Sequence, residues 1–400
     1  MENRYIGIIG ILFILLLSYL FSNNKKIINY RLVSIGLLMQ VITGIFILKI
    51  PVGRKIIGVI AKGVTELLEL SRTGGEFVFG SLANSHDLIF AVQVIPTIIF
   101  ICALVSILYY FGILQVIVKF FAFIFNKLLG VSGAEALANS AVVFVGQVES
   151  AIVIQPYLSK LTKSEILTIM TGGMACISGS LMAIYSGLGV RTEYLLAASF
   201  MAAPGSFVIS KIFYPEDGKP VTKDSVKVEY KAKEKNLVEA ILDGAFSGAK
   251  ISIGVIAMLL AFISLVSLVD KLLFLVNNSL SLKTILGYLF TPLVYLTGVP
   301  KEDVNIVSQL FGTKISLNEF IAYLDLSKLI QLNSLSQKGQ AIATFLLCGF
   351  ANFSSIAIQV GGLSQMAPER KSDLASLGFK AMICGALVSS ISACIVGILL

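Results

Sequence analysis

The chain has 400 residues, of which 56% are hydrophobic and only 14% are charged, well below the roughly 25% typical of soluble domains. A water-soluble fold of this length would need a charged surface that this composition lacks, so the sequence predicts an all-α polytopic membrane protein. The net charge of +8 does not indicate nucleic-acid binding, because the lysines and arginines fall mainly in short loops, where they orient membrane proteins.

Residue chemistry excludes several kinds of active site. The chain has a single histidine, which excludes a metalloenzyme built on histidines. An intramembrane enzyme would need a nucleophile with a base, and its candidate is Ser150 beside Glu149, without a histidine near it. We therefore expect no catalytic residue and no bound metal. The cysteines lie inside apolar segments without metal-site spacing, which indicates buried packing residues: Cys102, Cys176, Cys348, Cys384 and Cys394.

The N-terminal part contains three apolar runs, at 4–21, 32–50 and 88–112, each close to the ~20 residues that a bilayer requires. The first is followed by asparagines and lysines rather than by a small-residue cleavage site, so we expect a span and not a removed signal. Residues 53–72 place apolar side chains on one helical face and charges elsewhere. This predicts an amphipathic helix along the membrane interface, with a soluble loop helix as the alternative.

Beyond residue 114 the apolar runs are short or rich in small residues, and a polar stretch at 214–236 predicts a solvated linker. A long segment then opens at Asn236 and Glu239 and extends to Val276. The other runs lie at 114–130, 136–146, 150–158, 165–187, 193–213, 284–298, 303–332, 340–360 and 373–400. We accordingly divide the chain into 1–113, 114–213, the linker 214–236 and 237–400.

Two polar stretches interrupt this apolar pattern, at Gly146–Ser150 and at Cys348–Ser355. Backbone that leaves a helix at membrane depth must line a cavity or be buried in protein, because lipid cannot satisfy its N–H and C=O groups. A broken helix with an acid or an amide at the break is typical of the binding site of a transporter. The two stretches therefore predict that this protein moves a solute.

The sequences after the two breaks resemble each other. Thr162-Lys163-Ser164-Glu165 follows the first break and Arg370-Lys371-Ser372-Asp373 follows the second, and each precedes a segment rich in small residues. Ser-Glu and Ser-Asp at a helix start are expected to cap free N–H groups and to suit the positive end of the helix dipole. This predicts an internal repeat, whose interface holds the binding site in many transporters.

Four acid or amide side chains lie in apolar surroundings: Gln147, Glu149, Glu319 and Asn352. A carboxylate within a membrane segment is costly and is a functional candidate; the alternative is that each faces a loop or pairs with a lysine such as Lys314. Carboxylates accept hydrogen bonds from sugar hydroxyls, and amides offer both a donor and an acceptor to the edge of a base. Without a cluster of basic residues or a P-loop, the set suits a neutral polyhydroxylated ligand rather than a phosphate.

Three motifs resemble those of the concentrative nucleoside transporter family: Gly146-Gln147-Val148-Glu149, Asn318-Glu319-Phe320 and Cys348–Ser355. Segments 76–81, 109–112 and 367–371 fit as well, so the agreement extends in order over about residues 30–400. The resemblance implies about eight transmembrane helices, two re-entrant helical hairpins pointing at each other and a homotrimer. It also implies an elevator-like movement of the hairpin-bearing core against a scaffold that includes residues 1–113.

The resemblance also implies the substrate contacts. Gln147 and Glu149 would meet the nucleobase beside Val148, Glu319 and the second break would meet the ribose, and Phe350 would shape the pocket. The full expected set is Gln147, Val148, Glu149, Leu181, Ile251, Glu319, Phe350, Asn352 and Ser355.

Three positions depart from the family pattern. The family's threonine is Val148 here, and the side-chain oxygens that hold sodium are replaced by Val142 and Cys176. Sodium prefers hard oxygen ligands, so only backbone carbonyls of Val142, Val145, Cys176 and Ile177 could contribute. We therefore expect protons rather than sodium to drive uptake, with Glu149 or Glu319 as the carrier.

The sequence thus predicts a cation-coupled nucleoside importer of the cytoplasmic membrane that needs no cofactor. A symporter or a channel for a different small neutral solute is the alternative.

Overall fold

The computed structural model describes residues 2–84, 90–223, 235–278 and 280–400, which form α-helices and short 3-10 turns without a strand. The N-terminal helices are α1 (Glu2–Leu20), α2 (Tyr30–Leu48), α3 (Pro51–Phe79) and α4 (Phe90–Tyr110). Next come α5 (Ile113–Leu129), α6 (Gly133–Ala141), α7 (Glu149–Ile152), α8 (Gln155–Leu158), α9 (Lys163–Ala175), α10 (Gly179–Gly187) and α11 (Thr192–Phe213). The last are α12 (Leu237–Val276), α13 (Leu282–Tyr295), α14 (Val304–Ser316), α15 (Glu319–Gln331), α16 (Gln337–Leu347), α17 (Phe353–Met366) and α18 (Lys371–Leu399). The predicted all-α class is confirmed.

Several of these helices suit a bilayer by length and composition. In the described residues, four pass as candidate spans: Tyr30–Leu48, Lys163–Gly187, Thr192–Phe213 and Pro368–Leu399. A fifth candidate is the pair Ile95–Tyr110 and Ile113–Leu129, bent by 76° at the glycine between them. Tyr5–Leu20 and Leu282–Tyr295 are shorter apolar helices. A multi-pass membrane protein fits these helices, and the count of about eight spans stays a prediction.

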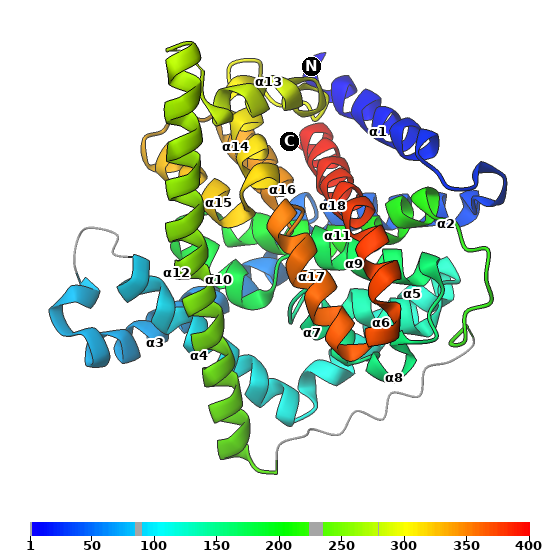
Figure 1. The fold of residues 1–400 in the computed structure, drawn as a ribbon, viewed down its shortest axis with the longest axis horizontal. Helices are drawn as coiled ribbons and strands as arrows, with labels where there is room; N and C mark the ends of the chain where they lie inside the picture. The colour runs from blue at the N-terminus through cyan, green and yellow to red at the C-terminus, as the bar shows by residue number, and fades with distance from the viewer. Residues whose placement is uncertain (1, 85–89, 224–234, 279) are drawn as a thin grey trace.

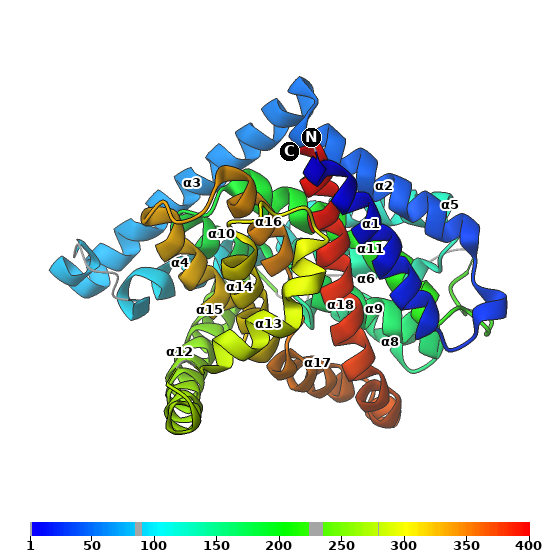
Figure 2. The same cartoon turned by 90° about the horizontal axis from the view of Figure 1, so that it is seen from above.

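The amphipathic helix predicted at 53–72 is longer than expected. Helix α3 begins at Pro51, a favoured residue for the first helical turn, and continues to Phe79. It buries a stripe with helical spacing that includes Ile57 and Ala61, while the Lys62–Glu66 pair is exposed. In Figure 2 it crosses the upper edge of the molecule obliquely. Its position at a membrane interface stays a prediction.

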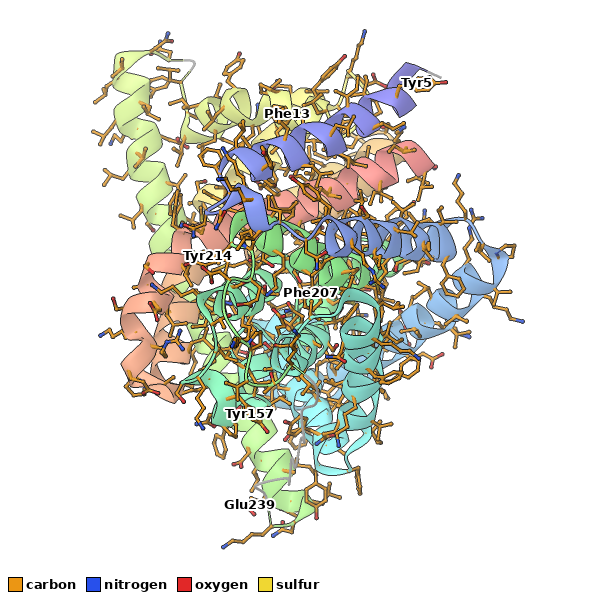
Figure 3. The ribbon with its side chains drawn as sticks, turned by 90° about the vertical axis from the view of Figure 1, so that its right-hand side faces the viewer. Tyr5, Phe13, Tyr157, Phe207, Tyr214 and Glu239 are labelled. Carbon is orange, nitrogen blue, oxygen red and sulfur yellow. The ribbon has the colours of Figure 1, made fainter. Side chains whose placement is uncertain are left out.

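The centre of the molecule consists of α9, α11 and α18, which pack on one another (Figure 1). Most of α11 and α18 is buried, and their alanines, glycines and serines let the backbones approach closely. Figure 3 shows Phe207 of α11 inside this core, whereas Tyr5 and Phe13 of α1 lie at the outer edge. Phe207 is 0% exposed and Tyr5 is 70% exposed, as expected for a protein that offers apolar side chains to lipid.

Helix α12 lies along α4 (Figure 1). A Cβ atom on Gly244 would lie 2.7 Å from Ser106, and one on Gly248 would lie 2.7 Å from Ile99. The two glycines, four residues apart, therefore let the backbones of α12 and α4 come together, as small residues do between membrane helices.

Four interruptions of helices lie near one another in the fold. The two predicted ones are found: α6 ends at Ala141 and α7 begins at Glu149, and α16 ends at Leu347 and α17 begins at Phe353. Two further breaks divide runs that the sequence predicted as continuous. Cys176–Ser178 separates α9 from α10, and Leu317–Asn318 separates α14 from α15.

The prediction of matching helix caps is wrong in detail. Helix α9 is capped by Thr162, two residues earlier than Ser164, in a reciprocal pair with Glu165. Helix α18 has no side-chain cap; Asp373 pairs instead with Lys163 at 3.2 Å and with Arg370 at 3.0 Å. Asp373 therefore links the start of α18 to Lys163 at the start of α9. It does not cap its own helix, because the basic side chains compete with the helix N-terminus for the carboxylate.

The predicted linker is described only in part, since 224–234 lie outside the described residues. Parts of 214–223 contact the rest of the fold. Glu216 lies 3.3 Å from the buried Lys211, and Thr222 accepts a hydrogen bond from the N–H of Ala134 at 3.1 Å. This part of the polar stretch therefore contacts the start of α6 and the end of α11.

Candidate binding site between the helix breaks

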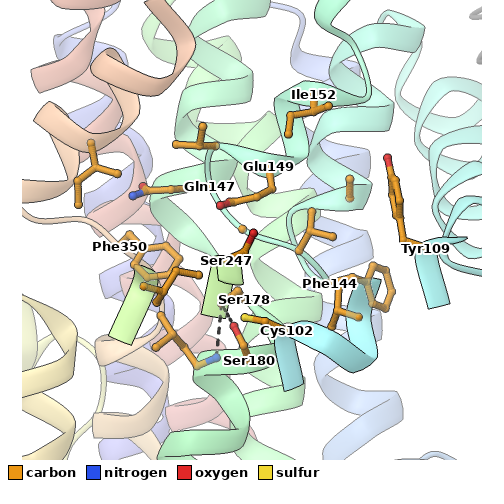
Figure 4. Close-up of a pocket in the computed structure, with 18 of the residues that line it drawn as sticks. Cys102, Tyr109, Phe144, Gln147, Glu149, Ile152, Ser178, Ser180, Ser247 and Phe350 are labelled. Carbon is orange, nitrogen blue, oxygen red and sulfur yellow. Dashed lines mark hydrogen bonds between the residues drawn. The ribbon is translucent and has the colours of Figure 1, made fainter. Parts of the chain in front are cut away.

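A cavity of about 700 Å³ opens where the breaks converge. Its walls come from α4, α5, α10, α12, α15 and α17 and from the two polar breaks (Figure 4). All nine residues predicted to contact a substrate line it: Gln147, Val148, Glu149, Leu181, Ile251, Glu319, Phe350, Asn352 and Ser355. Residues more than 200 positions apart in the sequence are thereby gathered around one space.

The first break presents an amide and an acid. Gln147 is 8% exposed, whereas Glu149, the first residue of α7, is exposed to the cavity. A Cβ atom on Gly146 would lie 2.2 Å from Oε2 of Glu149, so a side chain at this position would displace the carboxylate from its place beside the break. Figure 4 shows the side chains of Gln147 and Glu149 close together above Phe350.

The second break presents a fixed amide. Oδ1 of Asn352 caps α17 by accepting the N–H of Ser355 at 2.9 Å, and it also accepts the Ser354 hydroxyl at 2.7 Å. Because the oxygen is committed to the cap, the amide nitrogen must point the other way. It donates to Oε2 of Glu319 at 2.8 Å.

Glu319 is held from two sides and is only 4% exposed. Besides Asn352, the hydroxyl of Tyr185 donates to its Oε1 at 3.4 Å. A carboxylate has about four acceptor positions, so it retains capacity for hydroxyl groups of a ligand. The alternative of an ion pair with Lys314 is wrong: the hydrogen bonds of that lysine go to Leu346, Cys348 and Ser389.

The breaks also contact each other. The N–H of Gly179, at the start of α10, donates to the carbonyl of Phe144 in the first break at 3.3 Å. Gly349 in the second break has φ +96°, and a Cβ there would lie 2.5 Å from the carbonyl oxygens of Met174 and Ala175. The break after α9 is therefore in contact with both polar breaks and ties them into one unit.

Several polar residues that line the cavity were not predicted from the sequence. Ser178 and Ser180 line it from α10 and its cap, Gln115 from α5 and Ser247 from α12. For α12 a signal exists, since its lining residues follow helical spacing: Asp243, Gly244, Ser247, Ile251 and Gly254. A stripe of small and polar residues along an otherwise apolar helix is expected where that helix faces a cavity.

The four candidate cation residues behave differently from the substrate set. Val145 lines the cavity, whereas Val142, Cys176 and Ile177 are at most 1% exposed and belong to the core. The thiol of Cys176 faces the carbonyl of Ser199 at 3.8 Å. Apart from backbone carbonyls, these residues offer no oxygen to an ion.

Comparison with known proteins agrees with this geometry along the whole chain. Models described as the N- and C-terminus of the Na+ dependent nucleoside transporter match residues 9–82 and 194–397, and a model described as nucleoside recognition matches 91–191. An uncharacterized transporter of Haemophilus influenzae is 42% identical, covering 98% of this chain and 97% of the relative. The nucleoside permease NupC of Helicobacter pylori is 37% identical, with the same coverage.

Solved structures agree as well. CNTnw in an inward-facing substrate-bound state superposes with a TM-score of 0.95 at 37% identity, covering 99% of this chain and 97% of that one. The fold and the cavity thus define a membrane transporter for nucleosides. The chain belongs to the concentrative nucleoside transporter family, as its motifs predicted, and this is a family of transporters rather than enzymes.

Proposed function

We propose that this protein is a secondary active importer of the cytoplasmic membrane, which couples nucleoside uptake to a cation gradient by alternating access. The observation that supports this most is the convergence of the nine predicted contact residues on one cavity. A cavity of about 700 Å³ is within the range of small-molecule sites. The helix breaks hold Gln147, Glu149, Glu319 and Asn352 at this cavity, as expected for a site that selects by hydrogen bonding.

In this proposal the first break binds the nucleobase and the second binds the ribose. Gln147 offers amide donors and an acceptor to the base edge, and the exposed Glu149 accepts from N–H or O–H groups. Glu319, Asn352 and Ser355 bind ribose hydroxyls. The apolar surface is supplied by the remaining members of the set: Val148, Leu181, Ile251 and Phe350.

For the coupling ion, we propose the proton rather than sodium, although the matching family models are described as Na+ dependent. Val142 and Cys176 put a hydrocarbon and a thiol where sodium needs hard oxygens. Glu149 is exposed in the cavity and Glu319 accepts a hydrogen bond from Asn352 of the second break, so protonation of either changes the site directly. The carbonyls of Val142, Val145, Cys176 and Ile177 are the ligands left for sodium if it binds.

Uptake into proteoliposomes tests both parts of this proposal. Labelled uridine and adenosine are offered to the wild type and to Glu149→Gln under a proton gradient alone, then under a sodium gradient alone. We expect concentrative uptake with protons only, and its loss in the variant. Uptake with sodium only would refute proton coupling but would still support a nucleoside carrier. A folded wild-type protein that accumulates neither nucleoside would refute these substrates.

We further propose that the protein is a homotrimer in which a transport core moves against a scaffold, as the family resemblance implies. Two re-entrant hairpins, one containing α6 to α8 and the other α16 and α17, belong to a transport core made of residues 114–213 and 237–400. The N-terminal helices of residues 1–113 form the scaffold of a homotrimer. The exposed apolar side chains of α3 and α12 are consistent with a surface covered by lipid or by neighbouring subunits.

A further inference from the structure

A lysine is buried at the end of the second break. Lys314 of α14 is 0% exposed. Its Nζ donates to the carbonyl oxygens of Leu346 and Cys348, both at 2.8 Å, and to the hydroxyl of Ser389 at 3.2 Å. An ammonium group has three donors, so all three are used.

Its partners are the carbonyls that α16 leaves open. The last carbonyls of a helix have no partner within the helix. The carbonyl of Thr344 accepts the Tyr323 hydroxyl at 2.9 Å, and that of Phe345 accepts the N–H of Cys348 at 3.3 Å. The carbonyls of Leu346 and Cys348 are satisfied by Lys314. A positive charge is favourable here, because the helix C-terminus is the negative end of its dipole.

The neutrality of these partners is unusual for a buried lysine. Lys211, also buried, lies 2.8 Å from a carboxylate oxygen of Glu135 and 3.3 Å from one of Glu216. Lys314 forms no ion pair among the described residues, and a buried charge without a counter-charge is costly. Its three oxygen partners, two carbonyls and a hydroxyl, form the kind of ligand set that hard cations take from proteins.

The lysine acts on the substrate site through the backbone. It does not line the cavity. Cys348, whose carbonyl it binds, is followed by Gly349 against the end of α9, by Phe350 and then by Asn352, which caps α17 and orients Glu319. Fixing the carbonyl of Cys348 therefore fixes the direction in which the chain enters the second half of the site.

We propose that the ammonium group of Lys314 is a built-in cation for the second break. It fills the position that an ion from solution would otherwise have to fill, so the ribose half of the site keeps its shape whether or not the coupling ion is bound. Lys314 is thus a positioning residue. This inference rests on the proposed binding of nucleosides at the cavity. It adds that Lys314 fixes the shape of the half of the cavity that would bind the ribose.

Chemical rescue tests the inference. In choline buffer, purified Lys314→Ala is expected to bind uridine about tenfold or more weakly than the wild type, the loss expected when hydrogen bonds to a charged group are removed. Sodium or methylammonium should restore binding saturably in Lys314→Ala and leave the wild type unchanged. Lys314→Met, which fills the space without a charge, should lose affinity and resist rescue.

Lys338→Ala is the matched control, because this lysine also bonds a backbone carbonyl, that of Gly397 at 2.7 Å, away from the cavity. It should bind uridine like the wild type. Wild-type affinity in Lys314→Ala, or a loss that neither cation reverses, would overturn the inference, as would a variant that fails to fold with or without them.

Thermal unfolding separates this inference from the proposed function. The Tm of Lys314→Ala should rise with sodium or methylammonium while that of the wild type does not, whether or not a nucleoside binds. A wild type that binds no nucleoside would refute the substrate assignment, and the shift in Tm would still decide the role of Lys314.

Discussion

At the scale of single residues, the contact between Glu319 and Asn352 can be tested with one substitution. In Glu319→Gln, the new amide has either its oxygen or its NH₂ group facing Asn352. If the NH₂ group faces Asn352, that residue cannot turn its oxygen toward it without giving up the cap of α17. If the oxygen faces Asn352, the NH₂ group takes the place of the second carboxylate oxygen, which would accept from the ligand. Uridine affinity should therefore fall about tenfold to a hundredfold, since hydrogen bonds to charged groups contribute roughly 1.5–3 kcal/mol. Equilibrium binding to the purified protein measures this.

Asp325→Asn is the control for that substitution. Asp325 lies farther along the same helix α15, is partly exposed and pairs with Lys283. An exposed ion pair contributes at most about 1 kcal/mol, and the cavity is not involved, so affinity should stay within about twofold of the wild type. Unchanged binding in Glu319→Gln would show that the carboxylate does not meet the ligand.

At the scale of the elements, the contact between the second break and the end of α9 depends on Gly349. Its φ of +96° disfavours any side chain, and a Cβ would lie 2.5 Å from two carbonyl oxygens. Gly349→Ala should therefore lower the Tm and abolish uptake, because backbone strain of roughly 1–3 kcal/mol adds to a clash with backbone that cannot move aside. Thermal unfolding and uptake into proteoliposomes check both effects.

Gly361→Ala is the matched glycine substitution. This residue lies within α17, and a Cβ there meets nothing within 4 Å. Alanine is favoured over glycine inside a helix by roughly 0.5–1 kcal/mol, so the Tm should be unchanged or higher. Should both alanine variants transport equally well, the close approach of Gly349 would not be essential.

The breaks also show what the sequence could predict about these elements. Two were predictable because an acid or an amide stands in an apolar run, at Gln147-Val148-Glu149 and at Asn352. The break at Cys176–Ser178 was missed because neither an acid nor an amide stands in it. The break at Leu317–Asn318 did carry such a signal, in Asn318 and Glu319, but the run 303–332 was predicted as continuous. The side chains of Ser178 and Asn318 cap the helices that follow. Such caps were the available signal, but serine and asparagine also occur inside apolar helices.

At the scale of the whole molecule, the site depends on distances that no local pattern encodes. Helical spacing predicts which face of a helix is apolar, but it does not say that α4 and α12 reach the cavity formed by breaks far away in the sequence. The nine contact residues were expected from a family resemblance, which includes the tertiary arrangement implicitly. The serines and Gln115 belong to no such motif and were found only in the structure.

The proposed movement of core against scaffold can be tested where the two meet. Cys102 of α4 and Ser180 of α10 lie side by side on the wall of the cavity (Figure 4). In Ser180→Cys, mild oxidation should form a disulfide between α4 and α10, since the two helices pack on each other. Uptake should then stop, because the core can no longer move past the scaffold, and a reducing agent should restore it. In Cys102→Ala/Ser180→Cys, oxidation should change nothing. Full uptake by the cross-linked protein would show that α4 and α10 do not separate during transport, which would refute an elevator movement along this contact.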